Sequence, residues 1–194
     1  LKSGESKRIL ESGFDAHFAG DNSRVYFTES VGGTPYPETQ LSSVNLEGND
    51  KRTHLYGGDE VSEYRLSHDK KWVAFVHQFK TYVAPFVDNG QKVTIGPAMT
   101  SLPVTQLSAR AGEYLSWSAD NARVGWFHGP HYYERRLKEA FAFVEGSPET
   151  LPEPEEKGID LSFEADADKP SGYKALVGGT VVTMRDADNT KEII

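Results

Sequence analysis

Histidine side chains are where metal binding or acid–base catalysis would be sought first, and the chain has six of them. Only His128 and His131 lie close together, with Gly129 and Pro130 between them. A helical metal-binding pair is unfavourable there because proline interrupts a helix, and no carboxylate motif adjoins the pair. We therefore interpret both histidines as structural or solvent-facing and expect no metal ligand in this chain.

Other catalytic patterns are incomplete or missing. The sequence has no Gly-x-Ser-x-Gly elbow and no cysteine, so it has neither a serine-hydrolase motif nor a zinc–thiolate site. The runs Asp166–Asp168 and Asp186–Asn189 resemble calcium loops, but they lack the glycine at the sixth position and the closing glutamate. We interpret these runs as acidic turns and expect no catalytic residue in this chain.

The elements that would position any site come from one phrase that occurs three times. An aspartate marks each copy, and Asp21, Asp69 and Asp120 lie 48 and 51 residues apart. A valine follows four residues after each aspartate and an aromatic residue six after it, which is the period of two of a β-strand. The spacing resembles the period of about 40 to 50 residues of four-stranded propeller blades. The three phrases are His17–Asp21, Arg65–Asp69 and Ser116–Asp120.

Each aspartate is expected to form a tight hairpin turn, because its side chain can accept hydrogen bonds from the backbone amides just ahead. The strand that follows is apolar on both faces, most clearly in Trp72–Val76, as in a blade covered on both sides. Further strands are predicted in each repeat, including Thr81–Val87 and Gln91–Ile95 joined by a hairpin at Asp88–Gly90. Three unrelated hairpins in a sandwich are the alternative. The residues expected to be buried between blades are Val25, Phe27, Val73, Phe75, Val124 and Trp126.

The three phrases resemble the WD-like repeat of TolB-type propellers, in which a strand ends in a Trp/Leu-Ser-x-Asp turn and the next begins Val-x-Phe. Trp117–Asp120 carries this resemblance best, and it extends from about Leu1 to Leu137. In this family a blade closes with a short outer strand, and Ser6–Leu10 resembles such a strand of a preceding blade. The resemblance implies a chain that starts inside a propeller and favours a periplasmic or secreted location, while a cysteine-free sequence fits the cytoplasm as well.

The tail carries a second resemblance. Tyr173–Met184, rich in valine, glycine and threonine, is similar to the first strands of metal-dependent amidohydrolases, which make a small β-sandwich before the catalytic barrel. A group of large bacterial proteins joins TolB-type blades to this part in the same order. Their metal ligands begin with a His-x-His pair, which would lie beyond Ile194. The resemblance thus implies a divalent, zinc-like metal and a small-molecule substrate in the parent protein, and no cofactor in this part.

If the blades bind a ligand, polar residues early in each innermost strand are the candidates, because these strands line the central channel and its mouth. The alternative is that these residues merely face water in the channel. The candidates are His17, Glu63, Arg65, Glu113 and Ser116.

The sequence therefore predicts an all-β chain in three parts. Residues 1–144 are expected to form a partial β-propeller of about three four-stranded blades, and 145–172 an extended acidic, proline-rich linker. Residues 173–194 are expected to begin a β-sandwich. Two questions stay open. Ile159–Phe163 either belongs to the extended linker or docks on the propeller as an edge strand. Leu137–Val144 is either a short helix or the last strand of the third blade.

The charge and the incomplete ring determine the expected partners. A net charge of −8 disfavours nucleic acid and anionic lipid, and no apolar run approaches the roughly 18 residues of a membrane helix. Three blades do not close a ring, so the outer faces of the first and third blades would expose apolar surface to water. Self-association or pairing with the remaining half of the propeller is therefore expected. We interpret the chain as a non-catalytic accessory segment of an amidohydrolase; the alternative is a non-enzymatic, TolB-like scaffold that binds proteins.

Overall fold

The computed structural model describes residues 7–32, 37–167, 169, 171–173, 175, 177–181 and 192–193. The chain divides into two units, Leu1–Ser162 and Phe163–Ile194, which are treated separately. In the second unit β14 (Thr180–Val181) pairs antiparallel with β15 (Glu192–Ile193). Most of the segment that resembles an amidohydrolase start lies outside the described residues.

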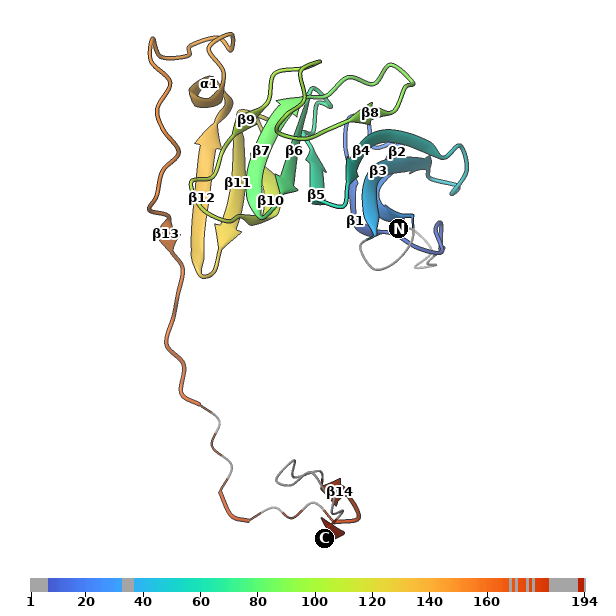
Figure 1. The fold of residues 1–194 in the computed structure, drawn as a ribbon, viewed down its shortest axis with the longest axis vertical. Helices are drawn as coiled ribbons and strands as arrows, with labels where there is room; N and C mark the ends of the chain where they lie inside the picture. Colours follow the sequence, from blue (N-terminus) through green and yellow to red (C-terminus); the bar gives the residue numbers. More distant parts are fainter. Residues whose placement is uncertain are drawn as a thin grey trace. The chain divides into compact units, whose positions relative to one another are not determined.

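The first unit holds three sheets, and each sheet contains one copy of the repeated phrase (Figure 1). The first sheet has β1 (Phe14–Phe18), β2 (Arg24–Val31), β3 (Glu38–Asn45), β4 (Arg52–Gly58) and β8 (Val93–Thr94). The second has β5 (Val61–Leu66), β6 (Trp72–His77), β7 (Lys80–Pro85) and β9 (Thr105–Gln106). The third has β10 (Glu113–Trp117), β11 (Arg123–His128), β12 (His131–Arg136) and β13 (Ile159–Asp160). The fold is all-β, as predicted, with sheets of four or five strands as in a partial propeller.

The predicted hairpin turns join the first two strands of all three sheets. Asp69 Oδ1 accepts hydrogen bonds from Ser67 Oγ at 2.6 Å and from the Lys71 amide at 3.1 Å. Asp120 has the same two kinds of donor in the third sheet. The residue after each aspartate has a φ of 59° in all three copies, a conformation that asparagine, present in the first and third copies, tolerates well and that Lys70 adopts in the second. The repeated sequence therefore forms the same turn three times.

The middle sheet is buried on both faces, which explains its continuous apolar sequence. Val73 and Phe75 of β6 pack toward the first sheet, whereas Ala74 and Val76 pack toward the third. All four side chains are at most 3% exposed. A strand alternates its side chains between two faces, so such burial requires a partner on each side.

All six residues predicted to lie between blades are buried, but two of them face elsewhere. Val25 and Phe27 form a separate cluster with Val44, against which Ile9 and Leu10 pack. The N-terminal segment, not a neighbouring sheet, therefore covers this face. The predicted outer strand at Ser6–Leu10 is wrong for Lys7–Leu10, which has no strand conformation, and Ser6 lies outside the described residues.

The predicted hairpin at Asp88–Gly90 is wrong. β8, which follows this turn, pairs in parallel with β4 of the first sheet, and β9 supplies the fourth strand of the second sheet. The Ile95 amide donates to Tyr56 O at 2.9 Å, and the Ile95 side chain is 4% exposed in the core between the first two sheets. Burial of a branched apolar side chain outweighs the local turn preference.

The segment after β12 resolves both open alternatives. Leu137–Ala140 is a short helix, α1, whose Leu137 and Ala140 are buried. β13 pairs antiparallel with β12, and the Leu161 amide donates to Pro130 O at 3.0 Å. Residues 159–161 thus dock as an edge strand, and the first unit extends to Ser162.

Candidate functional site

The three innermost strands carry an irregularity at the same place in every repeat. β1 shifts register between Phe14 and His17, β5 between Val61 and Glu63, and β10 between Glu113 and Ser116. These are β-bulges, which bend a strand and redirect its side chains. Asp15 and Tyr114 adopt positive φ angles of 52° and 57° in two of them.

The bulges of the three strands line one pocket, which we call the inner pocket. Its volume is about 370 Å³. Three carboxylates and one guanidinium face it, so its charge is predominantly negative. Of the residues that the sequence singled out, Glu63, Arg65 and Glu113 lie here, while His17 and Ser116 do not. The lining residues are Asp15, Ser62, Glu63, Arg65, Glu113, Tyr114 and Leu115.

Glu63 connects the second sheet to the third. Its carboxylate oxygens accept hydrogen bonds from the Tyr114 amide at 3.0 Å and from the Leu115 amide at 2.7 Å. Burial raises the pKa of Glu63, against the opposing effect of these two hydrogen bonds and of the Arg65 charge. Both oxygens are already engaged, so Glu63 serves as an anchor between sheets.

His17 connects the first sheet to the second in a similar way. Its Nδ1 lies 2.9 Å from Asp15 O, and its Nε2 accepts the Leu66 amide at 3.2 Å. These partners assign the proton to Nδ1 and leave the ring neutral. Burial lowers the pKa of His17 to about 4. His17 therefore holds two sheets together instead of facing a channel.

Ser116 and Arg65 have different surroundings. Ser116 Oγ donates to Gly125 O at 3.4 Å within the third sheet. The Arg65 carbonyl accepts the Trp117 indole N–H at 2.9 Å, a further contact between sheets, while its guanidinium lies 3.9 Å from Glu63. The buried Nε atom of Arg65 has no hydrogen-bond partner within the described part of the chain. Arg65 is thus the cation of the inner pocket, and one of its hydrogen-bond donors is unused.

A serine–histidine–aspartate chain lies between the first two sheets. His54 Nε2 is 2.8 Å from Ser43 Oγ, and His54 Nδ1 is 3.3 Å from Asp88. This order resembles a nucleophile activated by a base. However, Ser43 is fully buried and also accepts a hydrogen bond from Arg24 Nε at 2.9 Å. A substrate could not reach this hydroxyl, so these three side chains form a packing network that fixes the loop around Asp88.

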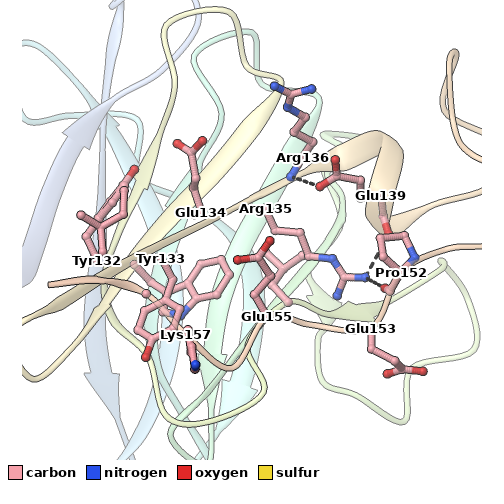
Figure 2. A pocket seen from close by; sticks show the side chains of 14 residues that line it. Tyr132, Tyr133, Glu134, Arg135, Arg136, Glu139, Pro152, Glu153, Glu155 and Lys157 are labelled. Atoms are coloured by element: carbon pink, nitrogen blue, oxygen red, sulfur yellow. Dashed lines mark hydrogen bonds between the residues drawn. The ribbon is translucent and has the colours of Figure 1, made fainter.

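A second cavity, the strap cavity, lies between β12 and the segment Pro152–Ile159 (Figure 2). Its volume is about 590 Å³. Arg135, 8% exposed, donates to the carbonyl oxygens of Gln106 at 3.1 Å, of Glu139 at 3.0 Å and of Pro152. This guanidinium fastens the segment to the third sheet, and its donors are used by protein groups.

Comparisons with protein-family models and with curated proteins find no match for this sequence. In the part of the chain that the structure describes, no three histidine, aspartate or glutamate side chains gather as a metal site would require. No described helix is long and apolar enough to cross a membrane. The inner pocket is built from all three repeats and is therefore a candidate site for binding a ligand.

Proposed function

We propose that the three sheets form a non-catalytic propeller segment that serves as an accessory domain of a metal-dependent amidohydrolase. In this role the blades shield or select access to a downstream centre that hydrolyses carbon–nitrogen bonds other than peptide bonds. The resemblance of Trp117–Asp120 and of Tyr173–Met184 to the two parts of such proteins supports the pairing. One structural observation supports the non-catalytic role.

That observation is the use of polar side chains on the inner strands. Glu63 in the inner pocket and His17 on β1 both accept backbone amides of the next sheet. A general base must hold a free lone pair toward its substrate. These groups instead join the sheets, which suits a rigid accessory domain.

The coding sequence beyond Ile194 provides the direct test. A His-x-His motif followed by hydrolysis of cyclic amides by the longer, zinc-loaded protein would support the proposal. The matched control is the same protein with both histidines of that motif replaced by alanine, which should lose zinc and activity together. A reading frame that stops after Ile194 would refute the amidohydrolase assignment.

The second candidate is a propeller scaffold that binds a protein, and the inner pocket favours it. Asp15, Glu63 and Glu113 outnumber Arg65 there, so a partner segment with a lysine or arginine would complement the pocket. Titration of a basic peptide should then show weaker binding to Asp15→Asn or Glu113→Gln than to the wild-type chain. Equal affinity of all three proteins would argue against this scaffold role.

A further inference from the structure

Three cationic side chains converge on a cavity at one end of the third sheet, which we call the basic pocket. Arg123 of β11, Arg136 of β12 and Lys138 of α1 line it, and its volume is about 450 Å³. Arg123 and Arg136 are direct partners in the antiparallel pair. Like charges placed directly opposite destabilise a strand pair. An anion bound here would relieve this repulsion.

The acidic groups of the protein neutralise this cluster only in part. Arg123 Nη1 pairs with Glu134 at 3.1 Å, but both side chains are about two-fifths exposed, so the pair is weak. Asp120 also lines the pocket, and hydrogen bonds from Ser118 and Ala122 hold the pKa of its carboxyl group below the usual value, so it contributes one negative charge. Arg136 and Lys138 form no ion pair with any residue that the structure describes.

The direction of the Arg136 side chain indicates that the basic pocket is separate from the strap cavity. Figure 2 shows its guanidinium pointing away from the strap cavity, whereas Arg135 points toward Pro152. The Arg136 backbone amide donates to Glu139 Oε2 at 3.3 Å. Glu145, the remaining acidic lining residue, is exposed and therefore well solvated.

The pocket also has an apolar wall. Leu137 is 5% exposed, and Val144 is half-buried beside it. We propose that the basic pocket binds a phosphomonoester, with the phosphate between Arg136 and Lys138 and the organic part against Leu137 and Val144. Arg136 and Lys138 form no ion pair among the described residues, a phosphate offers several acceptor oxygens, and arginine offers it paired donors.

Isothermal titration of the whole chain with phenyl phosphate tests this site. Inorganic phosphate reports on the head group alone, and benzoate supplies an aromatic ring with a single charge. The variants are Arg136→Gln and Lys138→Gln, which keep long polar side chains. Arg110→Gln is the matched control, because Arg110 is exposed and lies outside the basic pocket. Circular dichroism verifies that all variants retain the all-β fold.

Phenyl phosphate should bind saturably, more tightly than phosphate or benzoate. Either pocket variant should weaken binding about tenfold or more, the usual effect of losing a charge-assisted hydrogen bond. Arg110→Gln should bind as the wild type does. Absence of saturable binding at millimolar phenyl phosphate would overturn the proposal, and so would equal weakening by the control. Benzoate binding as tightly as phenyl phosphate would refute the preference for a dianion.

Discussion

Single polar residues hold neighbouring sheets of this protein together. His17 and Glu63 each accept backbone amides from the next sheet, and the Trp117 indole returns a hydrogen bond to Arg65. A buried acceptor that loses its partner costs more than the bond itself contributes. Residues that were candidates for ligand binding therefore have measurable roles in stability.

His17 should make stability depend on pH. Its pKa is 6.5 in an ordinary environment and about 4 in the folded chain, because burial disfavours the charged ring. The unfolded chain therefore takes up this proton first, so stability is complete above pH 6.5 and falls as the pH decreases toward 4. The loss should reach about 3 kcal/mol, measured by urea unfolding across this range.

The control for this prediction is His17→Gln, which cannot titrate. Its stability should be lower than that of the wild type at neutral pH, and it should change less with acidification. Burial lowers the pKa of His54 as well, so a residual dependence of the same sign is expected in the variant. Identical pH dependence in both proteins would show that His17 is not responsible.

Glu63→Gln should destabilise the chain by about 1 to 3 kcal/mol, because the amide group turns one acceptor into a donor facing a backbone N–H. Glu113→Gln is the matched control: Glu113 lines the same pocket but is exposed. Denaturant unfolding should place this control close to the wild type. Equal losses in both variants would mean that the contact between sheets contributes little.

At the scale of strands, the sequence predicted well what depends on local pattern. The three aspartates located the turns, and the valine and aromatic positions after them located buried strand residues in all three sheets. The fourth strand of the second sheet was misplaced, because Asp88–Gly90 is a strong local turn signal. What decides the pairing is the distant contact of Ile95 with the first sheet, which no local pattern reveals.

The inner pocket depends on backbone irregularities that no local pattern reveals. Glu63, Arg65 and Glu113 were found by assuming regular innermost strands. The bulges at Asp15, Ser62 and Tyr114 shift the side chains that follow, and their sequences have no shared residue type that would signal a bulge. His17 and Ser116 lie outside the lining of the inner pocket.

Phe75 should be a central residue of the middle sheet. It is fully buried in β6, and its ring lies 5.5 Å from that of Tyr82. Phe75→Ala should lower the free energy of unfolding by about 3 to 5 kcal/mol, as is usual for an aromatic cavity in a core. Phe79→Ala is the control, since Phe79 is 74% exposed, and its effect should be small. A loss for Phe75→Ala as small as that of the control would show that the two-sided core is not essential.

At the scale of the whole first unit, the two outer sheets differ. The free face of the first sheet is covered by Ile9 and Leu10, and its buried Glu29 accepts hydrogen bonds from Gln40, Ser42 and Lys51. Burial raises the pKa of Glu29, but these three donors outweigh it, so the pKa is lowered overall. The chain itself therefore covers part of this face, while Phe18, the strand partner of Val25, stays 52% exposed.

The third sheet is where association with another chain should occur. Phe127 and Tyr132 of neighbouring strands lie with ring centroids 5.3 Å apart and are half-buried, while Ser116 and Tyr114 are exposed. A propeller blade normally has a neighbour on such a face, and we expect a second copy of this chain to supply it. A specific contact would bury more than about 1,000 Å² of surface. Sedimentation equilibrium should therefore give a mass above that of the monomer at micromolar concentrations, decreasing on dilution.

Phe127→Asp should abolish this association, because a carboxylate in place of the Phe127 ring would be desolvated in the contact without a partner. Phe79→Asp adds the same charge at an exposed position of the second sheet and should leave the mass unchanged. A monomeric wild type at every micromolar concentration would mean that the third sheet is stable without a neighbour. A loss of association in both variants would instead indicate that net charge, and not this face, governs assembly.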